Sequence, residues 1–127
     1  MDFNSYVEDF NSNDEEAYTD RWFADDVVIE IPGAVLRGHA EWIEFMQNVR
    51  AGGSIRETME PITVVQEGDR VMAEIHLSFV TPDGSPDFPF GPLSPGEPST
   101  WKCFGVYHMQ DGKIARLKFG MWPEPVS

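Results

Sequence analysis

The chain has 127 residues, enough for one packed domain, and its nine Phe, four Trp and three Tyr contribute to a hydrophobic fraction of 41% that is not typical of a disordered chain. The formal net charge of −13 disfavours nucleic acid and anionic membrane surfaces as partners, because a field of that sign repels phosphate. Cys103 is the single cysteine, and the segment after Met1 lacks the basic and apolar regions of a signal peptide. We therefore expect one domain, residues 1–127, in the cytoplasm, with no disulfide and no membrane span.

The first half of the chain contains three segments with the apolar spacing of amphipathic helices. The first has apolar residues at i, i+3, i+4 and i+7, namely Phe3, Tyr6, Val7 and Phe10. A second helix is predicted after Asn13, which can cap it together with Glu16 three residues later, and residues 23–26 end it. A third is predicted over residues 39–50, with an apolar stripe made of Trp42, Phe45, Met46 and Val49.

Strand-like runs occupy most of the remaining sequence. Residues 27–31 are mainly β-branched and predict a short strand, and four longer runs follow at residues 55–66, 70–81, 100–110 and 113–122. Gly68-Asp69 and Asp111-Gly112 are typical of hairpin turns between consecutive runs. Helices followed by an antiparallel meander indicate an α+β fold, with helices packed on one face of a curved sheet.

A proline-rich segment interrupts the meander between residues 82 and 99, which hold six of the ten prolines. Long loops of this kind are commonly lids or disordered segments. Phe88, Phe90 and Leu93 give the segment apolar side chains that can dock on the domain. We expect the loop to border the mouth of a binding pocket.

The order of these elements resembles the nuclear transport factor 2-like superfamily, through residues 22–28, 38–45 and 111–114. The stretch of residues 88–96, followed by a strand and Asp-Gly-Lys-Ile, resembles the SnoaL-like polyketide cyclases within the ketosteroid isomerase-like group. The resemblance covers nearly the whole chain. It implies a cone-shaped, mostly antiparallel sheet with three N-terminal helices packed on its concave face, and a deep apolar pocket between them.

Alternation along the strands predicts which side chains face that pocket. In the 70–81 run the apolar set comprises Val71, Ala73, Ile75, Leu77 and Phe79. The apolar set of the last run comprises Ala115, Leu117, Phe119 and Met121. For the 100–110 run the resemblance implies that Trp101, Cys103, Gly105, Tyr107 and Met109 face inward, because periodicity alone is ambiguous there.

The resemblance also implies positions for catalytic groups, and this chain holds apolar residues or glycine at each of them. The general base of ketosteroid isomerases corresponds to Ile31, and their oxyanion-hole aspartate lies near Gly105. The aspartate of the cyclases lies near Phe119, and the Arg and Asp pair of the epoxide hydrolases lies at about Ile75 and Leu77. These departures argue against a mechanism that relies on carboxylates at the usual sites.

Four polar side chains remain as catalytic candidates. Tyr6 matches the helix-one tyrosine that donates to the oxyanion in ketosteroid isomerases, and Tyr107 is a second phenol candidate. Each can equally be a core aromatic whose hydroxyl is hydrogen-bonded. Glu74 and His76 share one strand face, where cross-strand ion pairs on the outside of the sheet explain them. If that face pointed inward, the two would form a buried acid–base pair.

The function favoured by these patterns is binding of a small hydrophobic, cyclic molecule, with cyclisation, isomerisation or dehydration as the expected kind of activity. The alternative is a non-catalytic binding or dimerisation module. No cofactor or metal is expected, since three scattered histidines and one cysteine form no ligand cluster. Phe104 and Val106 among polar residues predict a homodimer through the outer sheet face. The predicted substrate-binding residues are Tyr18, Trp22, Ile31, Trp42, Met46, Phe79, Phe88, Phe90, Trp101, Cys103, Phe119 and Met121.

Overall fold

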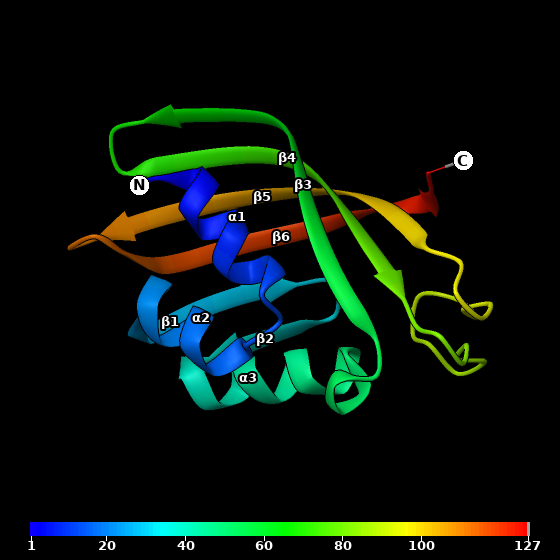
Figure 1. Cartoon of the computed structure of the whole chain (residues 1–127). Coiled ribbons are helices and arrows are strands. Elements are labelled where there is room, and N and C mark those ends of the chain that lie inside the picture. Colours follow the sequence, from blue (N-terminus) through cyan, green and yellow to red (C-terminus); the bar gives the residue numbers. More distant parts are fainter. Residues whose placement is uncertain (127) are drawn as a thin grey trace.

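The computed structural model describes residues 1–126 and confirms an α+β fold with three helices and one six-stranded sheet (Figure 1). The helices are α1 (Phe3–Asn11), α2 (Glu15–Trp22) and α3 (Gly38–Val49), and a short 3-10 turn (Ala51–Gly53) follows α3. The strands are β1 (Phe23–Ile31), β2 (Ala34–Arg37), β3 (Arg56–Glu67), β4 (Arg70–Val80), β5 (Ser99–Gln110) and β6 (Lys113–Pro125). Within residues 1–126, no helix has the length and apolar character needed to cross a membrane.

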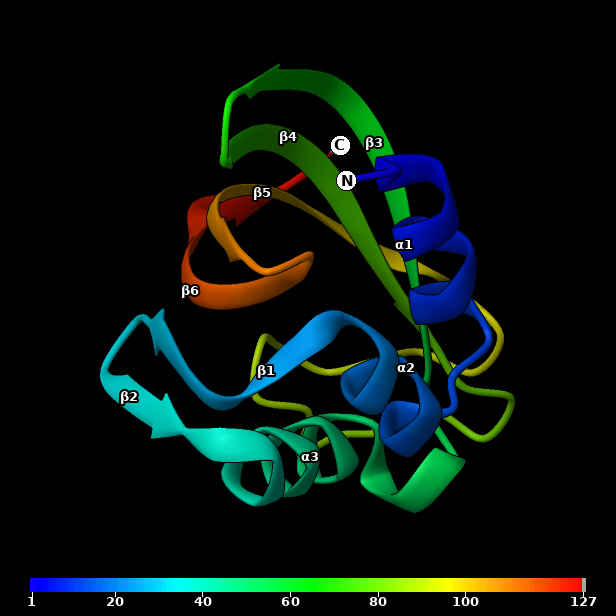
Figure 2. The ribbon, with the colours of Figure 1, turned by 90° about the vertical axis from the view of Figure 1, so that its left-hand side faces the viewer.

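The sheet has the order β2-β1-β6-β5-β4-β3, and all its pairs are antiparallel except the parallel pair β1–β6. Its strong curvature is visible in Figure 2, where β3 and β4 arch across the top of the molecule, β1 and β2 lie lower, and α3 lies beneath β1 and β2. The helices pack within this curve, with α1 against β3, α3 against β1, and α2 against α3. The expected arrangement of three N-terminal helices on a curved, mostly antiparallel sheet is therefore confirmed.

Helix α1 forms where its apolar stripe predicted it, and Phe3, Tyr6, Val7 and Phe10 are all buried. The cap of α2 differs from the prediction: Asp14 accepts the backbone N–H of Ala17, and Asn13 does not cap the helix. Asn13 has a φ of 61° instead, and its amide side chain bonds the backbone of β3 at Glu57. The long-range contact to β3 thus replaces the local capping role.

Two departures concern the first and last strands. β1 begins at Phe23, where residues 23–26 were expected only to end a helix, and it continues into the unpredicted strand β2. In β6 the register with β5 shifts, because His108 pairs with Arg116 and Met109 pairs with Ile114. Ala115, which was predicted to face inward, is therefore the extra residue of a bulge. Its neighbour Ile114 is buried in the core instead.

The alternation predicted for β4 is confirmed, since Val71, Ala73, Ile75, Leu77 and Phe79 are all buried. In β5 the inward set is confirmed for its middle, where Cys103 and Tyr107 are buried. Gly105 lies against Tyr107, and a Cβ at Gly105 would approach the ring of Tyr107 to 2.8 Å. The absence of a side chain at Gly105 leaves the space that the ring of Tyr107 occupies.

The segment between β4 and β5, residues 81–98 (the 81–98 loop), is tied to itself and to the core. Ser85 and Leu93 exchange two backbone hydrogen bonds of 2.9 and 2.8 Å. Phe88 and Leu93 are buried, and the ring of Phe88 lies 4.9 Å from that of Phe79. Burial of these side chains offsets the entropic cost of ordering a long loop.

Candidate functional site

An apolar cavity of about 220 Å³ lies where α3, the inner face of the sheet and the 81–98 loop meet. Aromatic side chains from separate elements form much of its wall: Trp42 and Phe45 from α3, Phe79 from β4, and Phe90 from the loop. The other lining residues are Phe10, Ile31, Pro32, Met46, Val49, Glu57, Met59, Leu77, Pro89, Leu117, Phe119 and Met121. The cavity therefore combines segments from nearly the whole chain.

Seven of the twelve predicted substrate-binding residues line this cavity. They are Ile31, Trp42, Met46, Phe79, Phe90, Phe119 and Met121. The other five lie outside its wall: Tyr18, Trp22, Phe88, Trp101 and Cys103. Phe88 and Trp101 nevertheless pack against Phe90, which does line the cavity; their ring centroids lie 5.3 and 6.2 Å from that of Phe90.

Tyr6, Tyr18 and Tyr107 form a buried group, here called the tyrosine cluster, that does not line the cavity. The hydroxyls of Tyr6 and Tyr18 lie 2.5 Å apart, and the rings of Tyr6 and Tyr107 meet edge to face at 5.5 Å. Burial raises the pKa of all three phenols, so they stay protonated at neutral pH. The predicted placement of Tyr6 and Tyr107 at the pocket is therefore wrong, because the α1 stripe packs them into the core.

Glu74 and His76 lie on the outer face of the sheet. The residues that alternate with them in β4 are the buried ones, and both line a shallow surface depression with Lys102 and Trp122. Thr63 donates to the Glu74 carboxylate at 3.4 Å. The structure thus contradicts the buried acid–base pair and places both side chains on the outer face, as the alternative expected, but within residues 1–126 neither forms the predicted cross-strand ion pair.

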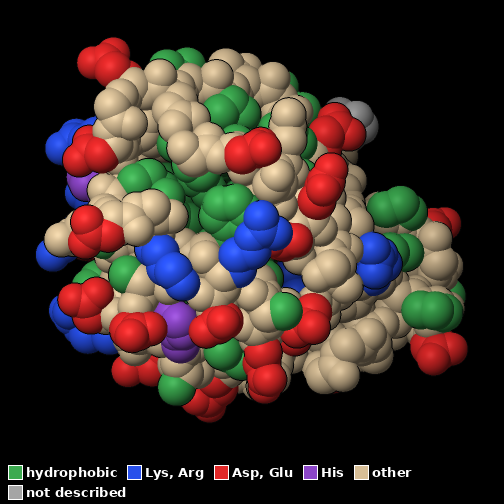
Figure 3. Space-filling view, turned by 60° about the vertical axis from the view of Figure 1, so that its left-hand side comes forward, with side chains coloured by type: hydrophobic (Ala, Val, Ile, Leu, Met, Phe, Trp, Pro, Cys, Tyr) green, Lys and Arg blue, Asp and Glu red, His purple; other side chains and the backbone are tan. Residues whose placement is uncertain are grey.

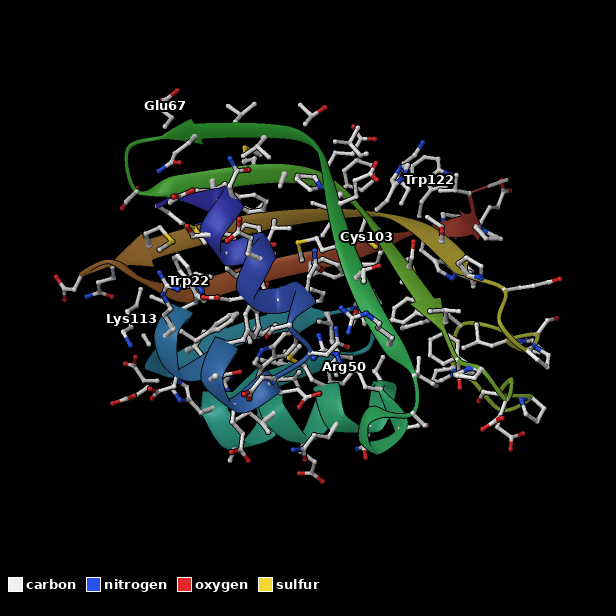
Figure 4. The ribbon with its side chains drawn as sticks, in the orientation of Figure 1. Trp22, Arg50, Glu67, Cys103, Lys113 and Trp122 are labelled. Carbon is white, nitrogen blue, oxygen red and sulfur yellow. The ribbon has the colours of Figure 1, made fainter. Side chains whose placement is uncertain are left out.

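The cavity wall contains one ionisable side chain among the described residues, Glu57 at the start of β3, and the sequence-based prediction missed it. Its carboxylate Oε1 accepts a hydrogen bond of 3.0 Å from Nε of Arg50, whose side chain is 1% exposed. The Nη1 of Arg50 also donates to Glu15 at 3.1 Å, while its Nη2 has no partner within residues 1–126. Figure 4 labels Arg50 in the interior of the molecule, between the helices and β3. We call these three side chains the buried charge cluster.

Burial controls the ionisation of Glu57. It raises the pKa of this carboxyl above its ordinary value, and the Arg50 guanidinium beside it opposes that increase. The buried carboxyl therefore keeps its proton to a higher pH than an exposed glutamate does. The cavity therefore has one end that can gain or lose a charge.

Local backbone structure explains why Glu57 and Arg50 meet. Arg50 follows the last turn of α3, and its carbonyl accepts from the N–H groups of Gly53 and Ile55, so the chain reverses directly into β3. On the other side of β3, the amide of Asn13 bonds both the N–H and the carbonyl of Glu57, at 3.1 and 2.8 Å. Asn11 does the same at Met59, at 2.7 and 3.0 Å. These two amides replace a neighbouring strand and hold the edge of β3 in place.

A signal for Glu57 exists in the sequence. Ile55, Glu57 and Met59 have the same parity in the first long strand, and the two apolar members are buried. A carboxylate within an apolar row is unusual and marks a candidate functional side chain. No local pattern indicates that Arg50 lies beside Glu57. From the sequence alone, Glu57 could therefore equally be an exposed residue at the edge of the strand.

Metal binding and thiol chemistry have little support at this site. The described residues contain no group of three or more His, Cys, Asp or Glu side chains able to hold a metal ion. Cys103 is fully buried, and burial raises the pKa of its thiol to about 12, which keeps it in the unreactive protonated form. Ile31, Leu77 and Phe119, three positions at which the resemblance implied charged groups, are apolar residues of the cavity wall.

Comparisons with known proteins agree on the family and the fold. A family model described as a SnoaL-like domain matches residues 3–117. A candidate polyketide cyclase from Xanthomonas campestris pv. campestris is 26% identical, with a TM-score of 0.73 over 93% of this chain and 85% of that one. The candidate hydroxylase AclR from Streptomyces galilaeus is 19% identical, with a TM-score of 0.74 over 94% and 85% of the two chains. An LEH-like epoxide hydrolase from M. tuberculosis is 15% identical, with a TM-score of 0.70 over 94% and 79%. No curated protein matches the chain.

Proposed function

Because this chain belongs to the SnoaL-like domain family, we propose that it binds a small, largely apolar cyclic molecule in the cavity between α3, the sheet and the 81–98 loop. The observation that carries the proposal is a cavity lined by aromatic and aliphatic side chains, with a single ionisable group at its wall within residues 1–126. Ligand sites of this composition bind apolar molecules and orient them through a few polar atoms.

The size of the cavity limits the ligand. An apolar cavity of ~150 Å³ is large enough to bind benzene, and the cavity here is about 220 Å³. A ligand of one ring, or of two fused rings, fits this space. The four rings of a steroid do not fit without movement of the 81–98 loop.

The chemistry that would follow binding is of the cyclisation, isomerisation or dehydration kind. Structural relatives include a candidate polyketide cyclase, a candidate hydroxylase and an epoxide hydrolase, so the fold alone does not select one reaction. The apolar side chains of Ile31, Leu77 and Phe119 favour binding and conformational control of a ring over a mechanism with charged groups at those positions.

Filling the cavity tests the proposal. Indane is a two-ring hydrocarbon that we expect to bind, with detection by isothermal titration calorimetry and by quenching of tryptophan fluorescence. Met121→Trp adds volume at the cavity wall and should abolish binding. Met72→Trp is the matched control, because Met72 is 55% exposed on the outer sheet face. Binding that survives Met121→Trp, or that is lost equally in both variants, contradicts the proposal.

We also propose that the protein forms a homodimer through the outer face of its sheet. Met72, Phe104 and Trp122 are each between 43% and 55% exposed there, and the rings of Phe104 and Trp122 lie 6.4 Å apart. Exposed apolar groups gathered on one face favour a protein contact. Figure 3 shows acidic side chains spread over the face that it draws, with Lys and Arg side chains among them. Sedimentation velocity should report a dimer for the wild type and a monomer for Phe104→Lys; a monomeric wild type at high micromolar concentration contradicts this proposal.

A further inference from the structure

The buried charge cluster has an unequal number of charges. Glu57 and Glu15 share one guanidinium, that of Arg50, so one negative charge is uncompensated when both carboxylates are ionised. The side chains of Arg50, Glu57 and Glu15 are only 1%, 9% and 16% exposed, so water screens this charge poorly. A proton on Glu57 or a cation beside it would remove this excess negative charge, which a poorly solvated site disfavours.

Glu57 is the member of the cluster that can receive that charge from the cavity. It lines the cavity, whereas Arg50 and Glu15 do not. Within the described residues, only its Oε1 is hydrogen-bonded, to Arg50, which leaves the second carboxylate oxygen free to accept from a ligand. Among the residues that the structure describes, no other lining side chain carries a charge, and the indole N–H of Trp42 is a buried donor without a partner.

We propose that the ligand is a small apolar amine, whose protonated nitrogen pairs with the carboxylate of Glu57 while its ring fills the apolar cavity. This inference rests on the proposed binding function and specifies the chemical class of the ligand. The excess negative charge can be neutralised either by a proton on Glu57 or by an ammonium group beside it, so the proton and the amine compete for the same carboxylate. A neutral alcohol can donate a hydrogen bond to Glu57, but it supplies no charge. The net charge of −13 also raises the local concentration of cations around the protein.

The pH dependence of amine binding should follow the titration of Glu57, because the phenols and the thiol near it do not titrate in the same pH range. The charges that act on Glu57 are those of Arg50, at the end of α3, and Glu15, in α2. The negative charge of Glu57 in turn raises the pKa of three neutral groups, Tyr6 in α1, Tyr18 in α2 and Cys103 in β5. Burial raises the pKa of both phenols and of the thiol, so these three groups remain neutral below pH 8. Since the pKa of Glu57 is raised, amine binding should release a proton and weaken as the pH falls.

Three ligands of nearly equal shape test this inference: indane, 2-indanol and 2-aminoindane, each titrated into the whole protein by calorimetry. In the wild type at pH 7, 2-aminoindane should bind about 10- to 100-fold more tightly than 2-indanol, the range expected for a charged hydrogen bond. Glu57→Gln should remove this preference, and the indane titration of the same variant reports whether its cavity still binds the ring. Gln can still accept the hydrogen bond from Arg50. Glu60→Gln is the matched control, because Glu60 is an exposed residue of the same strand.

Each outcome has a distinct meaning. An amine that binds no more tightly than the alcohol, or a preference that survives Glu57→Gln, overturns the amine inference while leaving ligand binding in the cavity intact. If none of the three ligands binds, the proposed function fails and the inference fails with it. If Glu57→Gln does not fold, the wild type alone decides: the amine preference should shrink as the pH is lowered through the titration of Glu57, whose pKa burial raises above its ordinary value, down to the lowest pH at which the protein stays folded. A preference that is independent of pH then overturns the inference.

Discussion

Replacement of Arg50 by methionine should cost this protein about 3 kcal/mol of unfolding free energy at pH 7. The guanidinium donates to Glu57 at 3.0 Å and to Glu15 at 3.1 Å, and it lies 4.9 Å from the ring centroid of Phe10. Removing one partner of a buried ion pair typically costs about 3–5 kcal/mol, since the remaining charge stays in a poorly solvated site. We expect the lower end of that range, because the 16% exposed side chain of Glu15 can turn toward water.

Urea unfolding followed by tryptophan fluorescence measures the loss. Arg21→Met is the matched control: Arg21 also pairs with a carboxylate, that of Asp9 at 2.8 Å, but its side chain is 60% exposed. Exposed pairs contribute about 0–1 kcal/mol, so this control should remain close to the wild type. An Arg50→Met loss below about 1 kcal/mol, equal to that of the control, refutes the reasoning that burial makes the pair essential.

The pH dependence of the Arg50→Met variant provides an independent check. Arg50 lowers the pKa of Glu57 against the larger effect of burial, so its removal raises that pKa further. Glu57 can then be protonated at mildly acidic pH, where it needs no positive partner. The loss should therefore be smaller at about pH 5 than at pH 7. An equal loss at both pH values means that Arg50 stabilises the fold through packing alone.

Three further predictions concern single side chains. The wild type should lose stability as the pH rises from 4.5, the ordinary pKa of a glutamate, through the raised pKa of Glu57, because the folded state holds that proton more tightly than the unfolded state. Glu57→Gln should abolish this part of the pH dependence of the unfolding free energy, measured with urea. Tyr6→Phe should cost about 1 kcal/mol through its lost hydroxyl pair with α2 and leave calorimetric indane binding unchanged, whereas weakened binding would place Tyr6 at the cavity after all. Gly105→Ala should cost about 1–3 kcal/mol in thermal unfolding, because the new Cβ would lie 2.8 Å from the ring of Tyr107, while Gly120→Ala, with nothing within 4 Å, should cost less.

The sequence alone determined the parts of this protein that depend on local periodicity. The apolar stripes of Phe3–Asn11 and Gly38–Val49 predicted α1 and α3 because side chains three and four residues apart share a helix face. Alternation in β4 identified its buried side, and Asp111 and Gly112, both with positive φ, identified the turn before β6. Resemblance over most of the chain added the curvature of the sheet and the inward set of β5.

Only the tertiary structure decided where the polar groups lie. Asn13 reaches the backbone of Glu57 across 44 residues, and Arg50 reaches Glu15 across 35, so no local pattern encodes either contact. The same holds for Tyr6, whose hydroxyl is directed to Tyr18 by the packing of α1 on α2 and is therefore unavailable to the cavity. Apolar burial is predictable from residue spacing, because it needs only a face. The partner of a buried charge depends on which distant segments the fold brings together. That physical difference is why seven of the sixteen lining residues could be predicted, all of them apolar, while Glu57 and its guanidinium could not.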